Sequence, residues 1–234
     1  MPKEALYFLI FFAILTSCKS TSNNPNSNKQ KSDSNLTRDT NIINSYKYKE
    51  EQDYLRRKRI LCDKLALYDL ERQTDSLELR VWYIPSMWDP SILYILKVED
   101  SKWTLFHYQI YMHTSTSEDH QFGDPVTEYF KNPVVDSVTM ENVRPQKIDW
   151  TTYIKNLEVD SLWNLETESS IKGKTFAVLD GHRYLLEINQ EGNYKYLFYT
   201  LPEYFQNKES NHRKFIEFKS RLVEPIIYKG MRNP

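Results

Sequence analysis

The chain is poor in the residues on which many binding and catalytic motifs depend. Of its 234 residues only 5 are glycine and 2 are cysteine, and its 31 basic residues are balanced by 32 acidic ones. Few glycines leave few positions for glycine-rich phosphate loops. The formal net charge of −1 argues against the basic stripe that nucleic-acid binders use. We therefore expect no nucleic-acid partner and no cofactor.

The signatures of several common enzyme classes are also missing. The chain has no HExxH, CxxC, GxSxG or GxGxxG pattern, so zinc proteases, redox sites, serine hydrolases and dinucleotide binders lack support. Acids of the kind that pair in glycosidases are present, including Glu141, Asp180 and Glu187, but any chain with 32 acids offers such pairs. The sequence therefore favours a protein without catalytic residues.

The longest hydrophobic run lies at the N-terminus. Residues 5–15 are all apolar, which is short of the about 20 residues that cross a bilayer. With Lys3 in front of it, this run matches the hydrophobic region of a secretory signal peptide. The following Leu15-Thr16-Ser17-Cys18 resembles the lipobox of bacterial lipoproteins. That resemblance implies removal of residues 1–17 and attachment of lipid, of the palmitate type, to Cys18.

A polar tract separates this cysteine from the rest of the chain. Residues 18–45 are rich in Ser, Asn, Thr and Lys and hold too little apolar surface to offset the entropy of ordering, so we expect a disordered tether. The lipid anchor predicts a membrane-attached protein of the cell envelope. No acidic residue occurs between Cys18 and Asp33. By resemblance to Bacteroidota-type lipoproteins, this favours the outer membrane with the domain facing the periplasm.

A helical pattern follows the tether. Tyr54, Leu61, Leu65 and Tyr68 recur at helical spacing and predict an amphipathic helix of about 25 residues. The run 56–59 (Arg-Arg-Lys-Arg) within it has two interpretations: a basic face for anionic lipid, or a solvated face paired with the acids one turn earlier. Cys62, which lies in the same pattern, is expected to be a buried small apolar residue without a disulfide partner.

The remainder alternates as strands do. Runs of β-branched and aromatic residues predict strands at 77–84, 91–98, 103–112, 138–143, 183–189 and 194–201. Helices are expected at 150–157, with Asp149 as N-cap, and around 215–222, ending before Pro225. This order predicts an α+β fold, a mainly antiparallel sheet of about five or six strands with helices on one face. We assign 46–230 to one domain.

Two groups of residues are candidates for chemistry. His107, His113, Asp119 and His120 offer the mixed nitrogen and oxygen ligands that zinc or copper sites use, if the loop after 112 swings back toward the strand. Asp180-Gly181-His182 precedes a strand, where an acid or a base can be displayed. A tight turn explains the Asp-Gly pair equally well.

Tryptophans form the third candidate group. Trp82, Trp88 and Trp103 cluster around the first predicted strands. Exposed aromatic rings stack on sugars or anchor protein partners, whereas buried ones serve the core. These residues therefore define a candidate binding region.

Several short motifs together resemble an uncharacterised bacterial lipoprotein domain family. They are Leu77–Trp82, Asp149-Trp150, Ser161–Trp163, Leu179–Glu187, Gly192–Tyr194 and Leu201-Pro202. The resemblance implies a fold and no assigned activity or catalytic residues.

Three hypotheses on function remain open. The first is a non-catalytic, lipid-anchored envelope protein that binds or assembles a protein partner. The second is a module that binds glycan or peptidoglycan, and the third is a hydrolase or metal-dependent enzyme.

Overall fold

The computed structural model describes residues 33–73, 77–85, 90–99, 101–114, 133–171 and 181–226, with side chains from residue 49 on, except that of residue 114. Within these ranges the chain forms one six-stranded antiparallel sheet with the strand order β4-β3-β2-β1-β5-β6. The predicted α+β class and the number of strands are confirmed. The predicted signal peptide, Cys18 and the first part of the predicted tether lie outside the described residues.

The strands lie close to the predicted ranges, except that β4 begins at Pro133 and not at residue 138. They are β1 (Glu78–Ile84), β2 (Ser91–Glu99), β3 (Lys102–Thr114), β4 (Pro133–Val143), β5 (Arg183–Gln190) and β6 (Asn193–Thr200). Strands β2 and β3 form one hairpin and β5 and β6 another, so consecutive strands pair as short connections require. Strand β1 lies between the two hairpins and joins them into one sheet.

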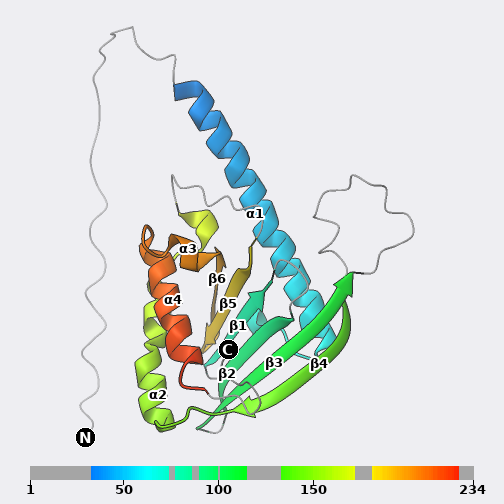
Figure 1. Ribbon diagram of the computed structural model, residues 1–234, viewed down its shortest axis with the longest axis vertical. Coiled ribbons are helices and arrows are strands. Elements are labelled where there is room, and N and C mark those ends of the chain that lie inside the picture. The colour runs from blue at the N-terminus through cyan, green and yellow to red at the C-terminus, as the bar shows by residue number, and fades with distance from the viewer. Residues whose placement is uncertain are drawn as a thin grey trace, which may run out of the picture.

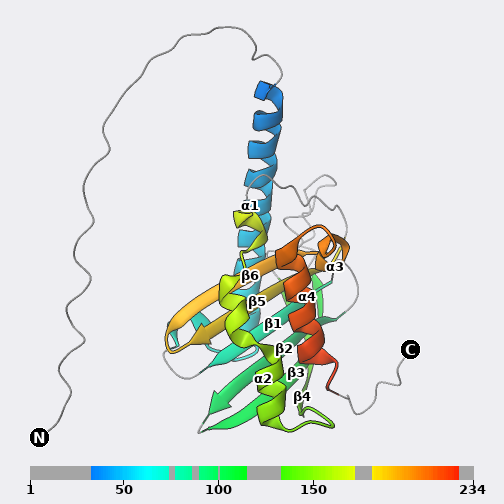
Figure 2. The ribbon, with the colours of Figure 1, turned by 90° about the vertical axis from the view of Figure 1, so that its left-hand side faces the viewer.

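One face of the sheet is covered by short helices and turns (Figures 1 and 2). They are α2 (Trp150–Leu157), the 3₁₀ turns η2 (Val159–Asn164) and η3 (Glu168–Ser170), α3 (Pro202–Phe205) and α4 (Ser210–Val223). Asp149 caps α2 as predicted, its carboxylate accepting from the Thr152 N–H at 2.9 Å. Buried residues of α2, η2 and α4, among them Tyr153, Leu162 and Phe215, fill the core on this side.

Helix α1 (Asp33–Lys64) lies on the opposite face and projects beyond the sheet (Figures 1 and 2). Helices therefore cover both faces, α2 and α4 one face and α1 the other. The helix also begins at Asp33, within the predicted tether. No glycine or proline occurs between residues 33 and 64, so nothing interrupts the helix N-terminal to the part that packs on the sheet.

A second core lies between α1 and the sheet. Alternate side chains of each strand point to opposite faces, and those on the α1 side form a separate buried cluster. It includes Tyr54 and Leu61 of α1 and Trp82, Leu93 and Leu185 of the strands. A short 3₁₀ turn, η1 (Leu70–Arg72), follows α1 and precedes β1. The sheet thus lies between two apolar cores.

In the described part of the chain, no helix combines the length and the apolar composition needed to span a membrane.

The β5–β6 turn allows a test of the local backbone. Glu191 and Gly192 both have positive φ, 53° and 82°, which is the type I′ geometry that favours Asn-Gly. We expect Glu191→Asn to raise the free energy of unfolding by about 0.5 kcal/mol and Gly192→Ala to lower it by about 1 kcal/mol. Urea denaturation of both variants measures the change. Because nothing lies within 4 Å of a Cβ at Gly192, an unchanged Gly192→Ala would contradict the turn geometry.

Candidate functional site

A buried carboxylate lies beneath α1, on the strand next to the β6 edge of the sheet. Glu187 of β5 accepts hydrogen bonds from Lys58 Nζ at 2.8 Å, Trp82 Nε1 at 3.0 Å and the Tyr194 hydroxyl at 3.0 Å. The side chains of Lys58 and Glu187 are 2% and 0% exposed. Glu187 was a candidate glycosidase acid and Trp82 a candidate binding residue. Both are closed off from any ligand and hold α1 on the sheet.

Arg80 extends this polar layer toward the end of α1. Its Nε donates to Glu78 at 2.7 Å and its NH1 to the carbonyl of Tyr68 at 2.9 Å. Its guanidinium also lies 4.8 Å from the Tyr68 ring centroid and within 3.7 Å of the Cys62 sulfur. Burial raises the pKa of the Cys62 thiol to about 11. The predicted assignment of Cys62 as a buried residue is confirmed.

The basic run 56–59 fits neither of its two interpretations as a whole. Arg57 and Lys58 are buried against the sheet, 9% and 3% exposed, whereas Arg56 and Arg59 are exposed. Arg59 pairs with Glu71, at 3.4 Å, and not with an acid one turn earlier. The helical spacing of the apolar residues in α1 does not reveal that a lysine between them faces an acid on a distant strand.

His182 lies in a second charged cluster on the other face. Its Nε2 is 2.9 Å from Glu203, which also accepts from Lys219 Nζ at 2.7 Å and from the Tyr184 hydroxyl at 3.2 Å. The His182 ring packs beside Tyr83 and Tyr184. Partial burial raises the pKa of Glu203, but the hydrogen bonds from His182 and Lys219 outweigh it and bring the pKa to about 2. Glu203 is therefore a carboxylate anion, and it orients the His182 ring through this hydrogen bond.

The histidines of β3 do not share a site. His107 is 3% exposed, packs on Tyr94 and has its pKa lowered by burial. His113 is exposed and lies 2.5 Å from Asp136. Six residues of extended strand separate the two histidines by about 20 Å, which is too far for one metal ion. The described ranges hold no group of three or more His, Cys, Asp or Glu able to bind a metal.

Several other candidates lie outside the described residues. They are Cys18, Trp88, Asp119, His120 and Asp180.

Trp103 lines a groove at one end of the sheet, on the α2 side. The groove has a volume of about 710 Å³ and lies where the start of β1, the β2–β3 hairpin, the β5–β6 turn and the α2–η2 junction meet. Its walls combine apolar and polar side chains from these four segments: Leu77, Val98, Trp103, Ile154, Lys155, Glu158, Val159, Asp160, Ser161, Gln190 and Glu191. Of the three tryptophan candidates, Trp103 is thus the one found in a described groove.

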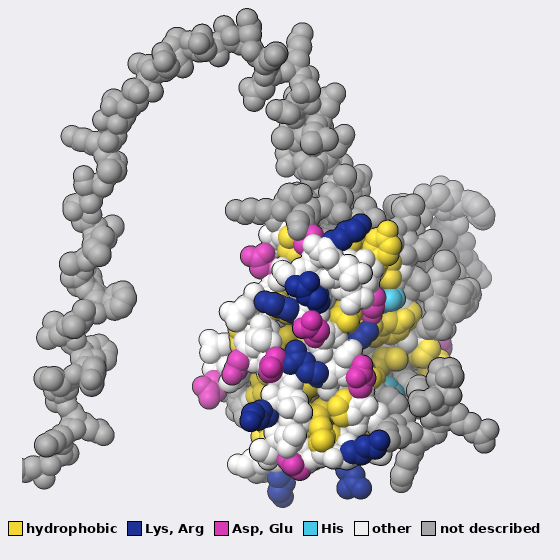
Figure 3. All heavy atoms as spheres, turned by 60° about the vertical axis from the view of Figure 1, so that its left-hand side comes forward, with side chains coloured by type: hydrophobic (Ala, Val, Ile, Leu, Met, Phe, Trp, Pro, Cys, Tyr) yellow, Lys and Arg dark blue, Asp and Glu magenta, His cyan; other side chains and the backbone are white. Residues whose placement is uncertain are grey.

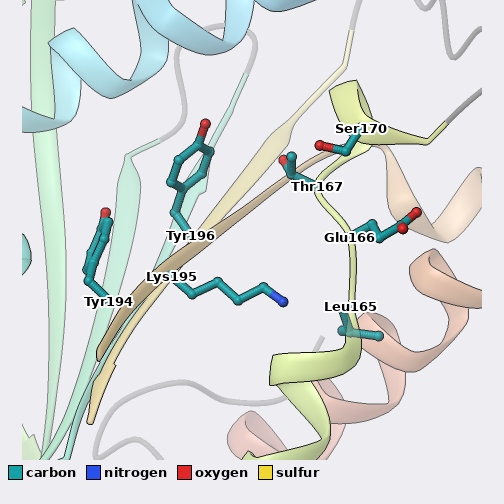
Figure 4. A pocket seen from close by; sticks show the side chains of 7 residues that line it. All are labelled: Leu165, Glu166, Thr167, Ser170, Tyr194, Lys195 and Tyr196. Atoms are coloured by element: carbon teal, nitrogen blue, oxygen red, sulfur yellow. The ribbon is translucent and has the colours of Figure 1, made fainter. Parts of the chain in front are cut away.

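A smaller pocket of about 510 Å³ lies at the β6 edge of the sheet (Figure 4). Tyr194 and Tyr196 project to one side of β6, and Lys195 points toward the segment that carries Leu165 and Glu166. The Lys195 ammonium donates to the carbonyl of Trp163 at 2.6 Å. This pocket therefore lies between β6 and a segment to which the strand is already bonded.

Side chains of that segment cap the rest of the β6 edge. Thr167 Oγ1 accepts from the Phe198 N–H at 3.0 Å, and Glu168 accepts from the Thr200 N–H at 2.9 Å. These two groups occupy the places that a neighbouring strand would take. The β6 edge is thus largely closed to strand pairing.

The β4 edge of the sheet, unlike the β6 edge, is exposed along most of its length. Residues 136–142 are exposed without exception, and β4 has β3 as its one strand neighbour in the described sheet. Val138 and Met140 are 38% and 56% exposed; they pair with Ile110 and Tyr108 and so lie on the α1 face. The register shifts beside Tyr111, which leaves one extra residue in β4 as a bulge.

The described surface of the face that carries α2 and α4 is mixed in charge. Figure 3 shows acidic and basic side chains interspersed over its described residues. Mixed charges of this kind are typical of a solvated surface.

The chain matches no family model, no curated protein and no solved structure.

Sequence reasoning missed the Glu187 network, the Glu203 cluster and the acids of the Trp103 groove. A signal existed only for the first, because Glu187 is a lone acid among the apolar residues of β5. The other groups depend on contacts between elements far apart in the chain.

The buried ion pair predicts that replacing Lys58 costs much more stability than replacing its exposed neighbour Arg59. Lys58→Met leaves Glu187 charged and without its cation, so we expect the free energy of unfolding to fall by about 3 kcal/mol. Arg59→Met removes a pair on an exposed face and should cost less than about 1 kcal/mol. Urea denaturation compares the two. Equal losses would mean that Glu187 does not carry a buried charge.

The Glu203 cluster predicts acid sensitivity. The pKa of the Glu203 carboxyl is about 2, against an ordinary 4.5. Between these values the folded state binds fewer protons than the unfolded state. The cluster therefore contributes stability that is present above pH 4.5 and is lost as the pH falls toward 2. Between pH 5 and pH 3, Glu203→Gln should lose less unfolding free energy than wild type. Glu217→Gln, at an exposed position of α4, is the matched control and should follow wild type.

Proposed function

We propose that the protein is a lipid-anchored envelope lipoprotein whose domain binds an extended segment of a partner protein along the β4 edge. The single observation that carries this proposal is the contrast between the two edges of the sheet. Side chains cap β6, whereas seven consecutive residues of β4 are exposed on both faces.

A long exposed edge strand offers its outward N–H and C=O groups to another strand, and folded proteins usually protect such an edge. Lysine and proline, which commonly give that protection, are both missing from residues 136–142. Strand addition of this kind gains affinity from main-chain hydrogen bonds and specificity from alternate side chains.

The side chains of β4 indicate what the partner segment carries. Val138 and Met140 present an apolar strip on the α1 face, which favours apolar residues at alternate positions of the partner. Asp136 and Glu141 are acidic and exposed. Because opposite charges stabilise cross-strand pairs, basic residues are favoured opposite them.

The proposed lipid anchor indicates where in the cell this interaction takes place. Lipid on Cys18 would hold the domain at the membrane, on the outer membrane and facing the periplasm by resemblance to other lipoproteins. An interaction at β4 would then recruit or position a second envelope protein there. This role requires no catalytic residue and no cofactor.

The proposal predicts a partner that is captured from the β4 edge. A photo-crosslinking amino acid at Ser137, in cells, should give one reproducible adduct, whereas the same probe at Tyr204, 68% exposed on α3, should not give it. Val138→Glu with Met140→Glu should reduce the Ser137 adduct about tenfold, because it places two charges on the apolar strip. Cys18→Ala should reduce it by removing the anchor.

Two results would contradict this assignment. One is the same adduct from Ser137 and Tyr204. The other is a Ser137 adduct that survives the double Glu substitution in protein whose unfolding midpoint is unchanged.

A further inference from the structure

We propose that the Trp103 groove binds a glycan chain of uncharged sugars. This inference is independent of the β4 proposal, since the groove lies on the α2 face at one end of the sheet and no residue of β4 lines it. The size of the groove, its aromatic wall, its polar rim and its charge all favour such a ligand.

The groove has the dimensions of a ligand site. Its volume of about 710 Å³ lies within the range of about 300–1,000 Å³ that is typical of small-molecule sites. Four chain segments converge on it, and two of them are tight hairpin turns fixed by strand pairing: Glu99 pairs with Lys102, and Gln190 pairs with Asn193. The walls are therefore set by paired strands and by the α2–η2 junction, and they do not depend on a long loop.

Trp103 supplies an aromatic wall. The residue pairs with Val98 across the β2–β3 ladder and packs partly against the core, while the rest of its side chain lines the groove. With Leu77 and Ile154 it forms an apolar surface. A pyranose ring has an apolar face of C–H groups that packs on such an indole.

Polar groups surround this apolar surface. Asp160, Ser161, Gln190 and Glu191 bring two carboxylates, a hydroxyl and an amide to the groove. Sugar hydroxyls both donate and accept hydrogen bonds, and this set of side chains offers acceptors and donors in return. An aromatic wall with a rim of carboxylates and amides therefore matches a chain of hydroxylated rings better than a purely apolar ligand.

The charge of the lining selects against anions. Glu158, Asp160 and Glu191 face a single lysine, Lys155. Glu158 is also paired with Arg221 of α4, which leaves an acidic excess at Asp160 and Glu191. Phosphate-bearing or carboxylate-bearing sugars would meet like charge there, so the ligand is an uncharged hexose or N-acetylhexosamine chain.

Two of these acids occupy positions that favour glycine. Glu158 and Glu191 have φ of 51° and 53°, a left-handed conformation that is strained for a residue with a side chain. Both carboxylates line the same groove. We expect Glu191→Asn to stabilise the fold and to weaken binding, a combination that a purely structural role for Glu191 would not give.

The test uses the full-length protein in detergent micelles and titration calorimetry with three probes. They are a tetramer of N-acetylglucosamine, a tetramer of glucose and an acidic tetramer of galacturonate. We expect one or both neutral tetramers to bind and the acidic tetramer not to bind. The neutral probe that binds better indicates whether the source is a cell-wall type or a storage or capsule type of glycan.

Variants assign the binding to the groove. Trp103→Ala should reduce the association constant about tenfold or more, and Asp160→Asn, at an exposed position, should reduce it without changing stability. Tyr204→Ala and Glu217→Gln are surface controls and should bind as wild type. Because Trp103 also packs on the core, Asp160→Asn and Gln190→Ala keep the test decisive if Trp103→Ala unfolds.

Three outcomes of the sugar titrations would overturn the proposal. They are no binding of either neutral tetramer, equal binding of the galacturonate tetramer, and neutral binding that Trp103→Ala, Asp160→Asn and Gln190→Ala all leave unchanged. Binding of a lysine-rich peptide in place of the sugars would assign the acidic groove to a cationic peptide and would equally overturn it.

Discussion

The carboxylate of Glu187 is the buried group that ties α1 to the sheet. Lys58 reaches it from the helix, while Trp82 and Tyr194 reach it from β1 and β6. Removing a buried carboxylate from water is costly, and this cost is offset only when every partner is in place. One rotation of α1 about its axis meets that condition, because a turn of the helix away from it would withdraw the lysine. The network therefore fixes α1 on the sheet more specifically than apolar packing alone would.

The two edges of the sheet differ in whether side chains cap their outward main-chain groups. At β6, Thr167 and Glu168 bond the outward N–H groups of the strand. At β4 the described chain has no such cap along residues 136–142, although a bulge beside Tyr111 interrupts the ladder. A sheet that is closed on one side and open on the other can add a strand in one place only. This asymmetry, and not any reactive group, is the main support for a protein partner.

The groove at the end of the sheet is a second consequence of the hairpins. Tight turns bring Glu191 close to the α2–η2 junction, and the start of β3 adds Trp103. Glu158 and Glu191 both adopt the left-handed conformation here, which lowers the stability of the fold. Strained residues that line a groove are typical of binding sites, where the side chain matters more than the ease of the turn. The β4 edge and the groove are separate surfaces, so a protein partner and a glycan need not exclude each other.

The sequence by itself determined the class of fold. Period-two alternation placed five strands nearly to the residue and part of the sixth, β4, and Asp149 and Pro225 marked helix ends, because these signals are local. It also indicated that Cys62 is buried. Only the tertiary structure decided that Trp82 is closed off while Trp103 lines a groove, that His107 and His113 are apart, and that Lys58 meets Glu187. These outcomes depend on which strands become neighbours and on which face α1 packs, and both are contacts between residues far apart in the chain. Local patterns carry no information on such contacts, so the fold was predictable from the sequence to a degree that the candidate sites were not.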